Sequence, residues 1–131
     1  MVEDFRDILA ELVKAEARFL VVGAHAVGVH GVPRATVDLD VWVERTPENA
    51  RRVWRALAAF GAPLDELDVS ETDFTRPDVV VQFGLPPYRI DILTSITGVS
   101  FDEAWPERVE DAFGDVRVPF LGRAALLRNK R

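Results

Sequence analysis

The sequence predicts a single α+β domain, of α/β character, in which helices flank a mixed β-sheet. Three observations predict this fold class. Helical stripes of apolar residues alternate with short strand-like segments, two such segments adjoin directly in the second half, and the 131 residues suffice for one domain but not for two. A chain of this length buries about two-thirds of its unfolded surface. Because the sequence contains no cysteine, we expect one core formed without disulfides.

The first part of the chain is expected to form a helix, a strand, a short helix and a second strand. Residues 3–16 carry apolar side chains at helical spacing. Residues 19–22 form a short apolar run that Gly23 stops, which indicates a buried strand. Residues 24–30 offer a short helix. Residues 37–43 alternate strictly and are rich in β-branched side chains, which is typical of a strand.

A longer helix is expected next, followed by two strands. Thr46 is a good N-cap residue, and proline follows it at the first helical position. The helix then runs to Phe60, because Gly61 can supply the left-handed C-cap. After a polar, irregular stretch, residues 79–83 and 88–93 have the composition of strands.

The last part of the chain is expected to be mixed. A short helix is predicted at 101–108, and Gly114 with Asp115 favours a hairpin turn. A final helix begins at 121 and reaches the last residue, 131. The whole chain, 1–131, is thus interpreted as one domain.

Composition disfavours several functional classes. The formal charge is −6, from 16 basic and 22 acidic residues, whereas a domain that binds nucleic acid mainly through phosphates has a basic excess. The longest uncharged stretch, from Phe19 to Pro33, is too short and too polar to span a bilayer. The N-terminus lacks the basic head and apolar run of a signal peptide. We therefore expect a cytoplasmic protein with no membrane association.

Two carboxylates share one face of the strand expected at 37–43. Because successive side chains in a strand point to opposite faces, Asp38, Asp40 and Trp42 lie together, with about 6–7 Å between the Cα atoms of neighbours on that face. Close carboxylates repel each other unless a cation lies between them, and Mg²⁺ takes oxygen ligands. The alternative is that both aspartates simply occupy the solvated face of an edge strand.

A third carboxylate, Asp91, stands between two isoleucines in the strand expected at 88–93. If this strand is a neighbour of 37–43, Asp91 can join Asp38 and Asp40 on one face. Three carboxylates around two Mg²⁺ ions form an arrangement that transfers phosphoryl or nucleotidyl groups. The alternative is a surface Asp91 that is paired with Arg89 or Arg76.

The junction between the first strand and the following helix is a candidate phosphate site. Gly23 permits a tight turn and a close approach of the backbone. The helix that follows presents unpaired N–H groups and the positive end of its dipole, which suit phosphate oxygens. His25 could donate a hydrogen bond there, although a histidine in apolar surroundings is more often a packing residue. We interpret His30 as structural.

These motifs, taken in chain order, resemble the signature of the DNA polymerase β-like nucleotidyltransferase superfamily. Residues 20–43 match its pattern of strand, glycine turn, short helix and Asp-x-Asp, with Gly23 as the first glycine and Asp38 and Asp40 as the paired carboxylates. Asp91 matches the third carboxylate. The resemblance implies a nucleotidyltransferase-like fold.

The resemblance is strongest to small bacterial members of the superfamily related to the abortive-infection, toxin–antitoxin type. The run at 34–40 and the segment at 96–105 are typical of that branch, and the similarity extends over about residues 3–130. Two features depart from it. Ala24 replaces the usual second glycine or serine, which removes a hydroxyl. The C-terminal helix also stops early, so we expect either a truncated product or a fold completed by a partner.

The resemblance implies a Mg²⁺-dependent enzyme that moves an NMP from an NTP such as ATP to a hydroxyl acceptor and releases pyrophosphate. Asp38 and Asp40 would hold both of two Mg²⁺ ions, and Asp91 would complete the site of the catalytic ion. The residues implied to bind the nucleotide are Gly23, Ala24, His25, Arg34, Thr36 and Lys130. The sequence does not identify the acceptor, which is a small molecule, a tRNA or a protein.

A second functional class fits the same residues. The early end of the chain and the loss of the second glycine or serine also suit a non-catalytic domain that binds a nucleotide or a partner. Such a partner, or a second copy of the chain in a homo-oligomer, would cover Ala125, Leu126 and Leu127. Trp42 could stack on a base, but packing in the core is the alternative.

Overall fold

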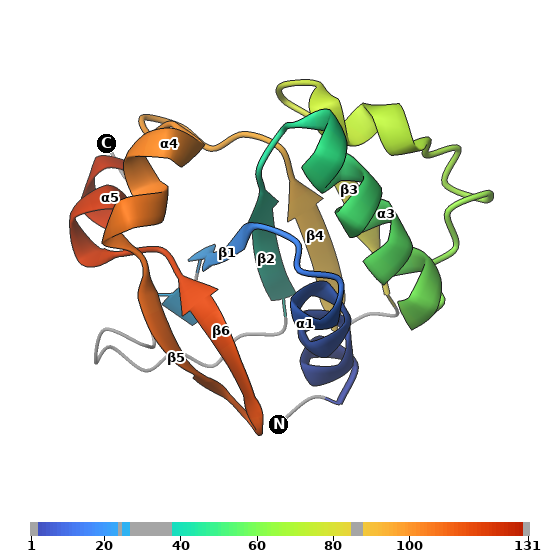
Figure 1. The fold of residues 1–131 in the computed structure, drawn as a ribbon, viewed down its shortest axis with the longest axis horizontal. Helices are drawn as coiled ribbons and strands as arrows, with labels where there is room; N and C mark the ends of the chain where they lie inside the picture. The colour runs from blue at the N-terminus through green and yellow to red at the C-terminus, as the bar shows by residue number, and fades with distance from the viewer. Residues whose placement is uncertain (1–2, 24, 27–37, 85–87, 130–131) are drawn as a thin grey trace.

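The computed structural model describes residues 3–23, 25–26, 38–84 and 88–129. Its centre is a six-stranded sheet with the strand order β3-β4-β2-β1-β6-β5 (Figure 1). The strands are β1 (Phe19–Val22), β2 (Asp38–Val43), β3 (Val80–Phe83), β4 (Arg89–Leu93), β5 (Val109–Phe113) and β6 (Val116–Phe120). The helices are α1 (Glu3–Lys14), α3 (Pro47–Phe60), α4 (Phe101–Ala104) and α5 (Arg123–Asn129), with 3₁₀ turns η1 (Glu71–Thr75) and η2 (Trp105–Glu107).

The sheet is mixed, as predicted. Strand β1 pairs antiparallel with β2 and parallel with β6, and β2 pairs parallel with β4. The pairs β3–β4 and β5–β6 are antiparallel, and the second is a hairpin that turns at Gly114, as expected. The predicted α+β class, a mixed sheet flanked by helices, is therefore confirmed.

Local capping residues determine both ends of helix α3. Thr46 has extended backbone angles, and its hydroxyl accepts a hydrogen bond from the Asn49 N–H at 3.1 Å. Pro47 then occupies the first turn, where its missing N–H costs nothing. At the other end, Gly61 adopts a φ of +94° and caps the helix. Both predicted ends are confirmed.

Three segments differ from the prediction or lie outside the described residues. The stretch predicted to be irregular contains η1, which buries Phe74 completely. The short helix expected at 101–108 is divided into α4 and η2, because Pro106 cannot donate the N–H that a continued α-helix needs. Of the helix expected at 24–30, the structure describes only His25 and Ala26, which are helical.

The two faces of the sheet bury different cores. Helices α1 and α3 lie side by side over one face (Figure 1), and with Leu39, Val41 and Val43 they form the larger core. The smaller core contains Trp42 and lies beneath α4 and α5. Because side chains alternate along β2, this second face is the one that carries Asp38 and Asp40.

The C-terminal helix packs against the smaller core. Ala125 is fully buried there and Leu126 is nearly so, whereas Leu127 is 55% exposed. The prediction that a partner covers all three residues is therefore wrong for two of them, because the chain itself covers them. Trp42 is buried and makes an edge contact with Phe101, so it packs in the core. None of the helices among the described residues is long and apolar enough to cross a bilayer.

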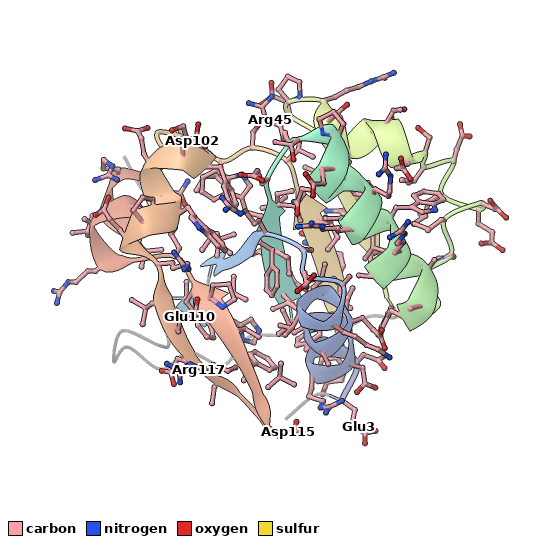
Figure 2. All side chains as sticks on the ribbon, viewed as in Figure 1. Glu3, Arg45, Asp102, Glu110, Asp115 and Arg117 are labelled. Atoms are coloured by element: carbon pink, nitrogen blue, oxygen red, sulfur yellow. The ribbon has the colours of Figure 1, made fainter. Side chains whose placement is uncertain are left out.

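The hairpin of β5 and β6 is tied to the first helix. Asp115, labelled in Figure 2 at the tip of the hairpin, lies near the start of α1. Both of its carboxylate oxygens accept hydrogen bonds from Arg6, at 2.7 and 2.9 Å. This bidentate pair connects helix α1 with the tip of the β5–β6 hairpin.

Asn49 joins three segments that position the sheet. Its side chain is buried, accepts a hydrogen bond from the Arg18 N–H at 2.6 Å, and donates to the carbonyls of Arg18 and Glu44, both at 2.9 Å. It therefore satisfies main-chain groups just before β1 and just after β2.

We predict that Asn49→Ala lowers the free energy of unfolding by about 2–3 kcal/mol, because it leaves buried main-chain groups without partners. Urea unfolding followed by circular dichroism measures the change. A loss below about 0.5 kcal/mol, the size expected of an ordinary surface substitution, would contradict this role.

Candidate functional site

Two neighbouring strands, β2 and β4, bring the predicted carboxylates to one face of the sheet. Asp40 of β2 lies opposite Val22 of β1 and opposite Asp91 of β4. Asp38 lies opposite Arg89 in the same pairing of β2 with β4. Residues opposite each other on neighbouring strands point to the same face. The register therefore places Asp38, Asp40 and Asp91 together, as the sequence analysis required for a shared site.

Arg89 connects two of these carboxylates. Its Nε donates to Asp91 Oδ1 at 2.9 Å, and its Nη2 lies 3.2 Å from Asp38 Oδ2 and 3.3 Å from Asp91 Oδ2. The Asp91 side chain is only 9% exposed, whereas those of Asp38 and Arg89 are 36% and 47% exposed. Asp91 therefore lies on the same face as Asp38 and Asp40, as the first interpretation predicted. It is also paired with Arg89, as the alternative predicted, but it is not at the surface.

Asp40 is the carboxylate with the most perturbed acidity. Burial, followed by repulsion from Asp91 and a hydrogen bond with it, raises the pKa of Asp40 to about 6, and the charge of Asp38 adds to the effect. Arg89 opposes the increase in this pKa but does not cancel it. A carboxylate held in this way favours either a proton or an additional cation.

This pKa predicts a dependence of stability on pH. Since the folded-state pKa of Asp40, about 6, lies above the ordinary value of 3.8, the proton favours the folded state. The stabilisation of the folded state by this proton is complete below about pH 4 and is lost as the pH rises through about 6. We compare the free energy of unfolding of Asp40→Asn with that of the wild type. Allowing for solvent screening of a partly exposed group, we expect this difference to shift by about 1–2 kcal/mol in favour of the variant between pH 4 and pH 7.5.

Urea unfolding at both pH values in the presence of a chelator measures this difference. The control is Asp65→Asn, since Asp65 is exposed in the turn after α3. A difference between wild type and Asp40→Asn that does not change with pH would contradict the assignment.

Gly23 brings the main chain against the Asp40 carboxylate. It follows directly after β1 and has a φ of +70°, which side chains rarely tolerate. A Cβ atom on Gly23 would overlap with Oδ2 of Asp40. Glycine is therefore required here both for the backbone angle and for the close approach.

His25 lies among aromatic side chains. Its ring is 5.6 Å from the ring of Phe5 in an edge contact and 5.4 Å from the ring of Phe113. Burial lowers the pKa of His25, against a hydrogen bond with the backbone of Asp38. Its Nε2 atom is shielded from solvent without a hydrogen-bond partner in the structure. This environment matches the packing interpretation, and a role of the side chain toward phosphate stays a prediction.

The other predicted nucleotide-binding residues lie outside the described part of the chain. They are Ala24, Arg34, Thr36 and Lys130. The structure therefore places Gly23, His25 and the three aspartates, and the roles of all these residues stay predictions.

The three aspartates offer carboxylate oxygen atoms to a divalent cation. Among the described residues, no three Asp, Glu or His side chains are arranged to hold a metal ion, and Arg89 contacts two of the three aspartates. In their chemistry the aspartates do fit one, because carboxylate oxygens are the ligands that Mg²⁺ prefers. Their repulsion, expressed in the pKa of Asp40, is what such a cation would relieve.

Gln82 lies on the same face of the sheet as the three aspartates and was not among the site residues predicted from the sequence. It lies in β3 directly opposite Asp91 and is exposed. The alternation Val79 to Phe83 already placed Gln82 and Val80 on one face, but only the register of β3 with β4 shows that this face is that of the carboxylates.

Together the mixed sheet and the helices around it define a nucleotidyltransferase-like fold. A crystal structure of a protein from Thermotoga maritima, described as a putative nucleotidyltransferase, is similar with a TM-score of 0.66 and 15% sequence identity. The similarity covers 95% of this chain and 79% of that chain. Neither a protein-family model nor a curated protein sequence matches the chain.

Proposed function

We propose that this protein is a Mg²⁺-dependent nucleotidyltransferase. It would move an NMP from an NTP to a hydroxyl acceptor and release pyrophosphate. The observation that carries the proposal is the convergence of Asp38, Asp40 and Asp91 on one face of the sheet, next to Gly23. The similarity in fold to the Thermotoga maritima protein supports the same class.

The proposed reaction is a displacement at the α-phosphorus. A bond forms between the acceptor oxygen and the α-phosphorus, and the bond to the oxygen that bridges to the β-phosphate breaks. Pyrophosphate leaves with that oxygen, and the proton of the acceptor hydroxyl passes to a carboxylate. Asp38, Asp40 and Asp91 are the residues that would hold two Mg²⁺ ions. When bound, such ions lower the pKa of the acceptor hydroxyl and neutralise charge on the phosphates.

The chain's own contribution is to set the positions of these groups. Strands β2 and β4 fix the spacing of the carboxylates, since their Cα atoms are in parallel register. Gly23 lies against the Asp40 carboxylate, and main-chain N–H groups of the turn that follows it are proposed to contact the β- and γ-phosphates. Arg34 and Thr36 are proposed to steady the triphosphate, and Lys130 to contact the nucleotide.

Transfer of label from an α-labelled NTP tests the proposal. Purified protein, each of the four labelled NTPs, Mg²⁺ and a cell extract should give a labelled acceptor, and a chelator should abolish the label. Asp38→Asn should abolish it as well, whereas Asp111→Asn, an exposed aspartate of the edge strand β5, should not.

Calorimetry with Mg²⁺ and a non-hydrolysable NTP distinguishes the second functional class. Binding together with turnover supports the enzyme. Binding without turnover in any extract favours a nucleotide sensor, and the absence of both favours an interaction module. The last two results would each overturn the proposed activity.

We also propose the finer assignment to small bacterial nucleotidyltransferases of the abortive-infection, toxin–antitoxin type, acting in the cytoplasm. The segments 34–40 and 96–105 support it. Expression in a bacterial host tests this assignment: growth arrest that depends on Asp38, and that is relieved by co-expression of the adjacent gene, is the expected result. Unimpaired growth would count against it.

A further inference from the structure

Arg89 contacts two of the three carboxylates that are proposed to bind a cation. Its guanidinium contacts both oxygens of Asp91 and Oδ2 of Asp38. These contacts arise from two geometric facts. Arg89 lies two residues before Asp91 on the same face of β4, and it lies directly opposite Asp38 across the β2–β4 pairing. One side chain can therefore reach both carboxylates.

Asp91 is the more buried of the two aspartates that Arg89 contacts. Asp91 is nearly buried, so its carboxylate depends on the guanidinium for compensation of its charge. Asp91, first through a hydrogen bond and then through its charge, raises the pKa of Arg89 further, and the charges of Asp38 and Asp40 act in the same direction. All three aspartates thus interact favourably with this single arginine.

We propose that Arg89 is a positioning residue, an internal counter-ion that orients Asp38 and Asp91 and competes with a divalent cation for their oxygen atoms. The inference rests on the proposed function, since it takes the same carboxylates as the cation site. Two cations close to one pair of carboxylates repel each other. Binding of a divalent cation therefore requires Arg89 to withdraw from at least one of its partners, which lowers the affinity and sets a threshold concentration.

Titration of Mn²⁺ by calorimetry or electron paramagnetic resonance tests the competition without measuring activity. We expect Arg89→Gln to bind Mn²⁺ about tenfold more tightly than the wild type, because the competing charge is gone. Arg51→Gln is the matched control, since it removes the same charge from an exposed position on α3, over the opposite face of the sheet. Its affinity should stay within about twofold of the wild type, because exposed distant charges are screened.

The outcomes separate the two proposals. Mn²⁺ binding that Arg89→Gln leaves unchanged or weakens overturns the role of Arg89 and leaves the proposed function standing. The absence of Mn²⁺ binding in every variant overturns both, because no cation site then exists. Should Arg89→Gln fail to fold, Arg89→Lys takes its place. Lysine cannot bridge both carboxylates with a planar fork, so tighter binding than in the wild type is again expected, and unchanged binding overturns the proposal.

A double-mutant cycle tests the positioning role separately. Urea unfolding in a chelator is measured for Arg89→Gln, Asp91→Asn and the double variant. We expect the destabilisation caused by Arg89→Gln to fall by about half or more in the Asp91→Asn background, because the uncompensated charge is absent there. Additive effects would mean that Arg89 does not act through Asp91, and would overturn the positioning role.

Discussion

Asp40→Asn is expected to reduce nucleotidyl transfer by about 10³-fold or more, since a ligand of the catalytic cations contributes several kcal/mol to the transition state. The reason is that Asp40 is the neighbour of both other aspartates: Asp38 lies two residues before it on β2, and Asp91 lies directly opposite it on β4. Asparagine keeps the shape but carries no charge and binds Mg²⁺ weakly. Initial rates of label transfer from an α-labelled NTP measure the loss.

The same substitution should not unfold the protein, and this separates chemistry from stability. Because the environment raises the pKa of Asp40 to about 6, its neutral replacement should be as stable as the wild type at pH 7.5, or more stable. Asp111→Asn on β5 is the control for the loss of one negative charge. Activity of Asp40→Asn within about tenfold of the wild type, the effect of only about 1.4 kcal/mol, would exclude Asp40 from the proposed catalytic role.

The alternation of residues in a strand made the face of each carboxylate predictable, but not the register between strands. The sequence predicted that Asp38 and Asp40 share a face with Trp42, and the burial of Leu39 and Val41 on the other face agrees. Nothing in the sequence states which residue of β4 lies opposite Asp40. A slip of one residue would move Asp91 to the opposite face of the sheet, so its contribution depends on long-range pairing.

Arg89 shows a second limit of prediction. The sequence offered Asp91 either as part of a carboxylate site or as the partner of an arginine, and treated these as alternatives. In the structure the long guanidinium side chain reaches along β4 and across to β2 at once. Asp91 is therefore paired with Arg89 on the shared face itself, but it is buried rather than at the surface, and its part in a metal site stays a prediction.

The environment of His25 was not predictable for a related reason. The helical turn after β1 was expected, but the direction of its side chains depends on which elements pack around it. Phe5 comes from α1 and Phe113 from the end of β5, far away in the sequence. Only the folded arrangement of these elements shows that the imidazole faces aromatic rings.

Gly23→Ala is the substitution that links the fold of the site to its chemistry most directly. The left-handed backbone costs about 1–2 kcal/mol for a residue with a side chain. In addition, the new methyl group would overlap with Oδ2 of Asp40, so either the carboxylate or the turn has to move. We expect a loss of about 2–4 kcal/mol in the free energy of unfolding. Transfer should fall about 100-fold or more, since a displacement of about 1 Å at a reacting group has effects of this size.

Gly61→Ala supplies the matched control. Gly61 also has a positive φ, +94°, but a Cβ atom there meets nothing within 4 Å. The free energy of unfolding of this variant should fall only by the cost of the left-handed backbone, about 1–2 kcal/mol. Its transfer rate should be unchanged under conditions where it is folded. If the two variants lost activity to the same degree, the contact between Gly23 and Asp40 would have no special part in the reaction. A selective loss in Gly23→Ala means that this glycine is required because the carboxylate lies against it.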